Sequence, residues 1–371
     1  MDPRSTAITE TLGAEGLRWF RAPGRVNLIG DHTDYHDGFV LPLAVDRDCV
    51  VAARPRDDGR VTAQSLELPG VVDVAADGSD EPVSVEPSWG RYVAGVVRAL
   101  VEAGRAPSGV DAVLSSTVPA GSGLSSSAAL EVAVALALGG SALSSRVLAL
   151  ACQHAEHLAT GVPSGAMDQL ASVLGEAGHA LLIDCRTLDA EPIPLPERLA
   201  VVVLHSGVTR TLAGSAYADR YAAGQTVAVR LGIRALRDAS LDQVRDEPVA
   251  RHVVTENRRV LDFADALRTG DATRLGALLL ASHASLRDDY EVSTPELDLA
   301  VDLLVEHGAI GARLTGAGFG GCVVALAEHT GARDVATKTL ARYRAETRLD
   351  AAAFVVRAVD GAGPLTTPTI A

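Results

Sequence analysis

The alternation of apolar and polar residues predicts mainly β-structure in the first hundred positions. One run, Phe39 to Arg54, is rich in β-branched residues and is long enough for a pair of strands. Another, Val61 to Ala76, is interrupted by a turn signal at Pro69-Gly70. A shorter mixed stretch, Leu17 to Ala22, predicts a strand that ends at Pro23-Gly24. The N-terminal part of the chain is therefore expected to be β-rich.

Helical spacing replaces the strand pattern in much of the remaining chain. Helices are expected at Trp89–Leu100, Ala128–Leu138, Leu148–Thr160, after Gly161–Gln169, and at Gly214–Arg230, Thr255–Leu267, Ala272–Asp288, Pro295–Glu306 and Ala332–Thr347. Short apolar strands are expected at Ala180–Asp184, Ala200–His205, Ala312–Thr315, Cys322–Ala327 and Ala353–Val359. This pattern is typical of an α+β protein made of two fused halves. The proline-rich segment Pro192–Pro196 is the candidate boundary region, which predicts domains at 1–190 and 191–371.

A loop rich in glycine and serine, Pro119 to Leu130, leads directly into one of these helices. It holds two glycines, four serines and no charged residue. Glycines let backbone N–H groups turn toward an anion, and the amino end of a helix attracts phosphate. A plain turn that caps a buried helix is the alternative. The loop has neither the Gly-Lys-Ser/Thr of a P-loop nor GxGxxG after a strand, so a nucleotide would be bound by another architecture.

Composition and charge exclude several classes of function. The 371-residue chain has a net charge of −14, which argues against broad binding to nucleic acid or anionic membranes. Its four cysteines have no paired spacing, so neither a disulfide framework nor a zinc site is expected. The N-terminus lacks a signal-peptide pattern, and no apolar run approaches the roughly 20 residues of a membrane span. We therefore expect a soluble, cytoplasmic protein.

Two pairs of ring-bearing residues are ambiguous from their spacing. Trp89 and Tyr92 lie three residues apart and share a helix face, where they could pack in a core or stack on a purine base. His154 and His157 have the same spacing but lack the HExxH frame, so they are expected to be surface residues rather than metal ligands.

Three motifs together indicate a family. They are PGRVNLIGDHTDY at Pro23–Tyr35, PAGSGLSSSAAL at Pro119–Leu130 and LTGAGFGGC at Leu314–Cys322. These resemble the motifs of the small-molecule kinase superfamily that contains galactokinases, homoserine kinases, mevalonate kinases and phosphomevalonate kinases. The match to the galactokinases is closer than to the others, and the first motif is nearly letter for letter the galactokinase signature. Further similarity extends the resemblance from about Arg21 to Ala362.

The resemblance implies a fold and a reaction. The fold would join an N-terminal ribosomal-protein-like β/α half to a C-terminal ferredoxin-like β/α half, with the active site between them. The reaction would transfer the γ-phosphoryl group of ATP, with Mg²⁺, to the anomeric C1 hydroxyl of α-D-galactose, giving galactose 1-phosphate and ADP. Such a transfer requires reactants held in line and charge neutralised on the transferring group.

The resemblance also implies roles for single residues. Asp168 corresponds to the catalytic aspartate, which would accept or orient the proton of the C1 hydroxyl, and Arg25 to the arginine paired with it. A plain buried ion pair is the alternative for these two. Two residues correspond to magnesium ligands, Ser127 and Glu156. Ser126 is the alternative to Ser127. Nucleotide contacts are implied for Trp89, Tyr92, Gly121, Ser122, Gly123, Leu124, Ser125, Ser126 and Ser127.

Sugar recognition is implied for a further set of residues. By resemblance, Asp34 would accept bonds from the C3 and C4 hydroxyls, Tyr217 would contact the C4 hydroxyl, Gly165 would line the pocket beside Asp168, and Asp31 and His32 would face C6. A carboxylate accepts two hydroxyl donors at once.

Two positions depart from the galactokinase pattern. Asp31 stands where Glu is usual, so its carboxylate is set back by roughly one C–C bond, about 1.5 Å. This predicts some tolerance for a modified C6, with galactose still preferred. Ala317 stands where Gly is common, which is minor if its φ is negative.

Two other functions remain compatible with the motifs. One is a kinase of a related sugar such as N-acetylgalactosamine. The other is a galactose sensor that binds without catalysis, although such proteins lack the Ser-Ala pair that is present here as Ser127-Ala128. We expect a small-molecule sugar and Mg-ATP as partners, no nucleic acid or membrane, and a monomer, with a weak dimer as the alternative.

Overall fold

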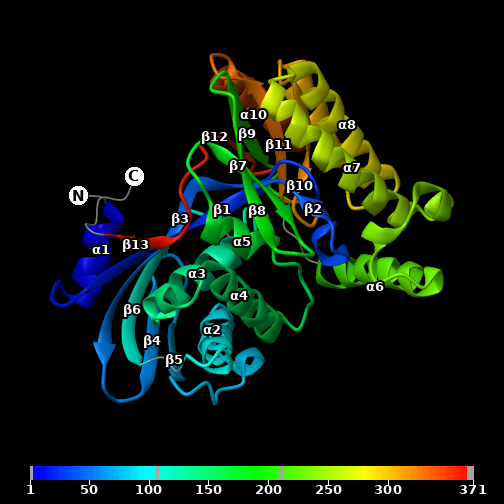
Figure 1. The fold of residues 1–371 in the computed structure, drawn as a ribbon. Helices are drawn as coiled ribbons and strands as arrows, with labels where there is room; N and C mark the ends of the chain where they lie inside the picture. Colours follow the sequence, from blue (N-terminus) through cyan, green and yellow to red (C-terminus); the bar gives the residue numbers. More distant parts are fainter. Residues whose placement is uncertain (1–2, 106–107, 120, 209–212, 366–371) are drawn as a thin grey trace.

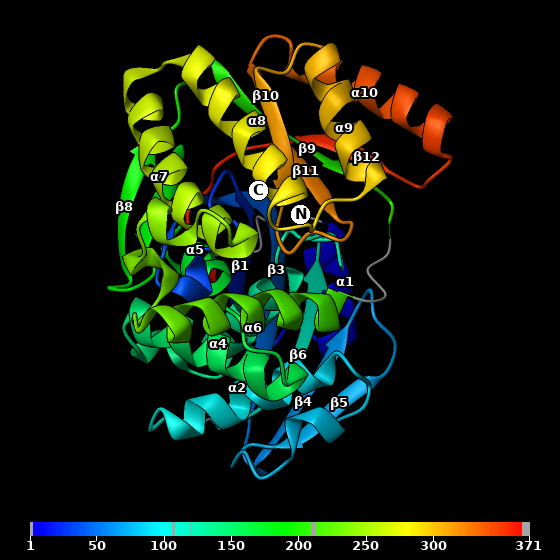
Figure 2. The same cartoon turned by 90° about the vertical axis from the view of Figure 1, so that its right-hand side faces the viewer.

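In the part of the chain that the structure describes, three β-sheets form the framework and helices cover them (Figures 1 and 2). The computed structural model describes residues 3–105, 108–119, 121–208 and 213–365. Runs of strands, such as β1 to β5 (residues 18–75) and β7 to β9 (179–205), are followed by runs of helices, such as α3 to α5 (126–174) and α6 to α9 (213–306), so the α+β class predicted from the sequence is confirmed. No helix in these described ranges is long and apolar enough to cross a membrane.

The largest sheet has six strands in the order β13-β1-β3-β6-β4-β5. β4 and β6 run parallel, and the other neighbours are antiparallel. The strands are β1 Arg18–Asn27, β3 Pro42–Arg56, β4 Arg60–Ser65, β5 Val71–Ala75, β6 Gly109–Ser116 and β13 Gly363–Leu365. The sequence pattern did not predict β6 or β13.

Helices cover both faces of this sheet. Successive side chains of β3 point to opposite faces, and apolar residues occur on each face, so both faces need a helical cover. Val51 and Ala53 belong to the main core, into which α3 also packs, whereas Val50 and Ala52 contact Ile8 of α1 on the opposite face. The helices of this part are α1 Pro3–Leu12, α2 Gly90–Glu102, α3 Ser126–Ala137, α4 Ser145–Thr160 and α5 Met167–Leu174. The sequence pattern did not predict α1.

A small sheet has the order β2-β7-β8, with β2 Phe39–Val40, β7 His179–Asp184 and β8 Asp189–Pro194. The proline-rich segment thus begins as an edge strand, whose residues Pro192 and Pro194 pair with Leu181 and His179. Residues two apart present their backbone nitrogens to the same side, so both prolines fit an edge without breaking the ladder to β7. The domain boundary between residues 190 and 191 falls within β8 and stays a prediction.

The third sheet has four antiparallel strands in the order β10-β11-β9-β12. Val201 and Val203 of β9 face the main core with α7 and α8, whereas Val202 and Leu204 face α9 and α10. The elements are β9 Leu199–His205, β10 Gly311–Thr315, β11 Cys322–Glu328, β12 Ala352–Val356, α6 Ala213–Leu231, α7 Pro248–Thr269, α8 Ala272–Asp288, α9 Pro295–Glu306 and α10 Ala332–Thr347. Here α8, α9 and α10 have the predicted bounds.

Candidate active site

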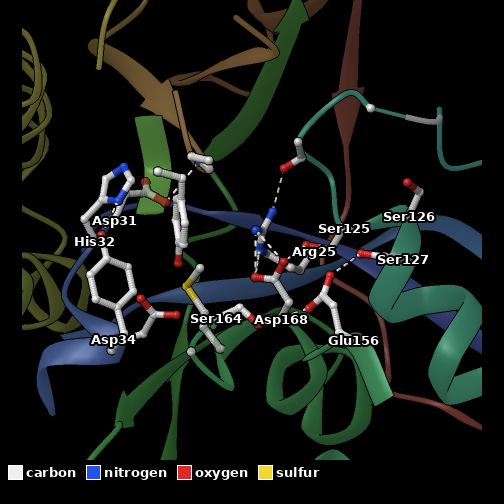
Figure 3. Close-up of a pocket in the computed structure, with 18 of the residues that line it drawn as sticks. Arg25, Asp31, His32, Asp34, Ser125, Ser126, Ser127, Glu156, Ser164 and Asp168 are labelled. Carbon is white, nitrogen blue, oxygen red and sulfur yellow. Dashed lines mark hydrogen bonds and ion pairs between the residues drawn. The ribbon is translucent and has the colours of Figure 1, made fainter. Parts of the chain in front are cut away.

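A pocket of about 320 Å³ lies where the three motifs meet (Figure 3). The predicted residues that line it are Arg25, Asp31, His32, Asp34, Tyr92, Gly121, Gly123, Ser125, Ser126, Ser127, Glu156, Gly165, Asp168 and Tyr217. Ser122 and Leu124 do not line it. The Ser122 hydroxyl donates to the carbonyl of Pro119 at 2.7 Å, and Leu124 is part of the main core. Trp89 borders a neighbouring cavity.

A bulge in β1 directs Arg25 into the pocket. The sequence predicted that this strand ends at Pro23-Gly24, but it continues to Asn27 with a register shift between Pro23 and Arg25. A Cβ on Gly24 would lie 2.6 Å from the carbonyl oxygen of Leu124, so only glycine permits this close approach. Bulges re-aim side chains next to active sites, and this one sets Arg25 beside the loop that precedes α3.

Arg25 and Asp168 form a two-point ion pair. Arg25 is 4% exposed, and its Nε and Nη2 donate to the two carboxylate oxygens of Asp168 at 2.7 and 2.8 Å. Arg25 Nη1 donates to the carbonyl of Gly123 at 2.6 Å, which fixes the guanidinium against the glycine-serine loop. Asp168 stands in the first turn of α5, and Figure 3 shows the pair between Ser125 and Glu156. The geometry positions Asp168 rigidly at the centre of the pocket.

Ser125 provides a third hydrogen bond to Asp168, which the sequence did not indicate. It precedes α3 in the left-handed region at φ 60°, which is uncommon for a residue with a side chain. This conformation brings its hydroxyl to 2.5 Å from Asp168 Oδ2. The signal in the sequence is weak because any serine of this loop could have served as the donor.

Ser127 and Glu156 lie together where the glycine-serine loop meets α4, at one side of the pocket. The Ser127 hydroxyl donates to Glu156 Oε1 at 2.8 Å. Burial, and next the charge of Asp168, raise the pKa of Glu156 above its ordinary value. The described residues contain no cluster of three or more His, Cys, Asp or Glu side chains arranged to hold a metal ion. A hydroxyl and one carboxylate nevertheless fit Mg²⁺, which is commonly held by one or two carboxylates together with phosphate oxygens.

The two histidines around Glu156 make other contacts. His154 is exposed, as predicted, and its Nε2 lies 2.7 Å from Glu102. His157 is half-buried and accepts a hydrogen bond at Nε2 from the backbone of Ser164 at 2.8 Å.

A second cavity, of about 670 Å³, adjoins the first and shares Tyr92, Gly121, Ser126 and Ser127 with it. Trp89 forms part of its wall, is 8% exposed and donates from Nε1 to the carbonyl of Pro69 at 3.0 Å. The indole therefore belongs to the core and also borders the cavity. Both interpretations of Trp89 from the sequence are compatible with this placement.

Asp34 and Gly165 are in close contact at the other side of the pocket. A Cβ on Gly165 would lie 1.9 Å from Asp34 Oδ2, so a side chain at 165 would displace the carboxylate. Burial, and next the charge of Asp168, raise the pKa of Asp34 to about 7. Tyr217 of α6 also faces this region, with its ring 5.4 Å from that of Tyr35.

The carboxylate of Asp31 is held by residues from the C-terminal part of the chain. Its Oδ2 lies 2.6 Å from Nη2 of Arg313, which is fully buried, and its Oδ1 accepts a hydrogen bond from the backbone of Gly316 at 3.0 Å. Both carboxylate oxygens of Asp31 thus already have partners within the protein. The contact of Asp31 with C6 of a sugar stays a prediction. Arg313 was missed, although an arginine inside an apolar strand is a signal for a buried charge partner.

Hydrogen-bonded rings extend from His32 into the C-terminal part. His32 Nδ1 lies 2.6 Å from the Tyr35 hydroxyl, which lies 3.0 Å from the Tyr290 hydroxyl. Burial lowers the pKa of His32 well below its ordinary value, so the imidazole is neutral. The sequence did not predict the participation of Tyr35 or Tyr290.

The second glycine loop, residues 316–321, is the turn between β10 and β11. Gly316 and Ala317 line the pocket, and Ala317 has a negative φ, so the absent glycine causes no strain at that position. The loop therefore forms part of the pocket wall.

Comparison with family models gives three matches along the chain. Residues 9–55 match a model described as galactokinase galactose-binding signature. Residues 91–176 and 263–345 match the GHMP kinase N-terminal domain and the GHMP kinase C-terminal region.

Individual relatives and a solved structure agree with these models. The galactokinase of Roseiflexus sp. (strain RS-1) is 48% identical over 361 residues, 92% of each chain. The galactokinase of Chloroflexus aurantiacus is 48% identical over 349 residues, 88% of each chain. The crystal structure of Lactococcus lactis galactokinase complexed with galactose superposes with a TM-score of 0.90 at 33% identity, covering 98% of this chain and all of that one.

Proposed function

The chain belongs to the galactokinase family, and from this membership and the geometry of its pocket we propose that it phosphorylates the C1 hydroxyl of α-D-galactose with ATP. The observation that carries the proposal is the placement of Asp168. Its carboxylate is fixed by Arg25 and Ser125 between the glycine-serine loop and Asp34. A sugar held by Asp34 and a triphosphate held by the loop would meet at Asp168.

The proposed step is an in-line transfer. The oxygen of the C1 hydroxyl forms a bond to the γ-phosphorus of ATP, and the bond from that phosphorus to the bridging oxygen of ADP breaks. The proton of the hydroxyl passes to Asp168, and Arg25 opposes the negative charge on the transferring group. The alternative role for Asp168 is to orient the hydroxyl without accepting its proton.

Magnesium is part of the proposal through Ser127 and Glu156. These two would hold the ion, which when bound neutralises charge on the β- and γ-phosphate oxygens. Their oxygens already lie 2.8 Å apart at the mouth of the loop. The larger cavity bordered by Trp89 and Tyr92 has room for the base of the nucleotide.

The test is a coupled measurement of ADP release with purified protein, Mg-ATP and galactose, with the product identified by ³¹P NMR as a sugar 1-phosphate. We expect kcat/KM for galactose to exceed that for N-acetylgalactosamine, and 6-deoxygalactose to retain part of the activity. Higher kcat/KM for N-acetylgalactosamine would favour the related-sugar kinase. Galactose binding in calorimetry without turnover would favour the sensor.

Three further proposals concern the protein as a whole. We propose a monomer, with a weak dimer as the alternative, a cytoplasmic location, and two domains that meet near residue 190. Light scattering across a concentration series tests the first, fractionation of cells tests the second, and limited proteolysis tests the third.

A further inference from the structure

A buried amide links Glu156 to a second glutamate deeper in the protein. Gln169, the residue after Asp168, is fully buried, and its Nε2 donates to Glu156 Oε2 at 3.0 Å and to Glu131 Oε2 at 2.9 Å. A glutamine amide has two N–H donors, so this arrangement uses both of them. In this orientation the nitrogen of the amide faces both carboxyl groups, and Gln169 Oε1 has no hydrogen-bond partner among the described residues.

Glu131 has no evident packing reason to be acidic. It is fully buried on α3 among alanine, leucine and valine residues. Neither Glu131 nor Glu156 forms an ion pair with a basic side chain in the described part of the chain. Burying a carboxyl group there costs free energy that a leucine would not. Among the residues that the structure describes, Gln169 is the one polar contact of the Glu131 side chain, which points to a role in holding that amide.

We propose that Glu131 and Gln169 are positioning residues for the magnesium-binding pair. Glu131 anchors the amide of Gln169, and the amide fixes Glu156 Oε2, so that Oε1 stays beside the Ser127 hydroxyl at 2.8 Å. The terminal torsion of a glutamate is otherwise broad. Ser164 also donates to Oε2, but at 3.3 Å, so it restrains this oxygen less. The inference rests on the proposed function, because that assigns Ser127 and Glu156 to magnesium.

The test measures magnesium-dependent nucleotide binding rather than turnover. A non-hydrolysable ATP analogue is held at fixed concentration and Mg²⁺ is titrated, with binding followed by calorimetry. Glu131→Leu removes the acceptor, whereas Glu131→Gln keeps the length and an acceptor oxygen. We expect the Mg²⁺ concentration at half-saturation to rise about 10- to 100-fold in Glu131→Leu, as is usual when a partner of a metal ligand is removed, and to stay within about threefold in Glu131→Gln. Galactose affinity without nucleotide should be unchanged in both.

Cys152→Ala is the matched control for packing. Cys152 is 1% exposed on α4. Burial, then the charges of Glu131 and Glu156, raise the pKa of its thiol, so both glutamates lie within electrostatic range of the sulfur. Its truncation alters the packing there without removing either hydrogen bond of Gln169, so we expect the Mg²⁺ dependence of wild type.

Two results would overturn the inference: a folded Glu131→Leu protein with the Mg²⁺ dependence of wild type, or an equal weakening in Cys152→Ala. If Glu131→Leu does not fold, Gln169→Met is used instead. It removes the amide that donates to both glutamates, so the same rise in the Mg²⁺ concentration at half-saturation is expected. A wild-type protein that binds the nucleotide with Mg²⁺ but does not phosphorylate galactose would contradict the proposed function and leave this inference standing.

Discussion

The two sides of the pocket are built in different ways. The side of the pocket proposed to hold the nucleotide, here the nucleotide side, is made from one stretch of the chain, between Ser65 at the end of β4 and Thr160 at the end of α4. The side proposed to hold the sugar, here the sugar side, starts from Asp31 and Asp34 near the N-terminus and is held by side chains of β10 and α7. Under the proposed function, nucleotide binding would depend on one stretch of the chain, whereas sugar binding would depend on the packing of segments far apart in sequence.

On the sugar side, buried polar contacts join the loop after β1 to elements far along the chain. Glu256 of α7 accepts from the backbone of Gly30 at 3.0 Å and from the hydroxyl of Ser282 at 2.5 Å. His252 Nε2 lies 3.1 Å from the carbonyl oxygen of Asp31, whose carboxylate pairs with Arg313. A buried polar network of this kind is stable only when its members are paired, so it fixes the loop after β1 against the third sheet.

The largest effect is expected where the two sides meet. Asp168→Ala should lower kcat by about 10²- to 10⁴-fold, the usual range for loss of a general base, with a smaller change in either KM. Steady-state kinetics with galactose and ATP measure this. Asp168→Asn is the sharper variant because it keeps the size of the side chain. Near-wild-type kcat in Asp168→Asn would contradict the proton-acceptor role and leave a positional one.

The next largest effect is on the stability of the fold, and it concerns the sugar side alone. Arg313→Met should lower the free energy of unfolding by about 3–5 kcal/mol, because it leaves Asp31 buried without its cationic partner. Urea denaturation measures the loss. The double variant Arg313→Met, Asp31→Asn should recover part of it, since the unpaired charge is then removed as well. Equal loss of stability in the single and double variants would show that the ion pair is not the cause.

The pH dependence of galactose binding should reveal Asp34. Its pKa of about 7 lies above the ordinary carboxyl value, so the group gains a proton as pH falls through 7. A protonated carboxyl loses acceptor capacity for sugar hydroxyls, and affinity should fall about tenfold per pH unit below 7. Calorimetry without nucleotide isolates this binding step.

The matched variant Asp34→Asn should bind galactose weakly at all pH values. It should also lose the acidic limb, which is the fall in galactose affinity below pH 7. Because the folded protein holds this proton more tightly than the unfolded chain, Asp34 itself should make wild type less stable as pH rises from about 4 to 7. An unchanged acidic limb in Asp34→Asn would assign it to another group.

The smallest effect is expected on the nucleotide side. Trp89→Phe keeps an aromatic ring but loses the hydrogen bond from Nε1 to Pro69, a contribution of about 1 kcal/mol. We therefore expect KM for ATP to rise only a few-fold and KM for galactose to stay constant. A parallel rise in both KM values would contradict the independence of the two sides.

The sequence by itself determined the parts that depend on local pattern. The helices α8, α9 and α10 have the predicted bounds, and local end signals mark two of them: Asp271 caps the start of α8, and Thr294 with Pro295 begins α9. Residues that the resemblance identified, such as Arg25 and Asp168, meet in the pocket. Weak or very short patterns failed: β13 is a three-residue edge strand, and β8 carries prolines that argue against a strand.

Only the tertiary structure decided which polar groups pair across the chain. The partners of Asp31 lie on β10 and in the loop after it, and the hydroxyl that contacts Asp168 comes from a residue in a left-handed conformation. Glu131 is a single acidic residue in an apolar helix, and its hydrogen-bond partner Gln169 lies on α5. Such pairings depend on the relative placement of elements far apart in sequence, which no periodicity within one element records.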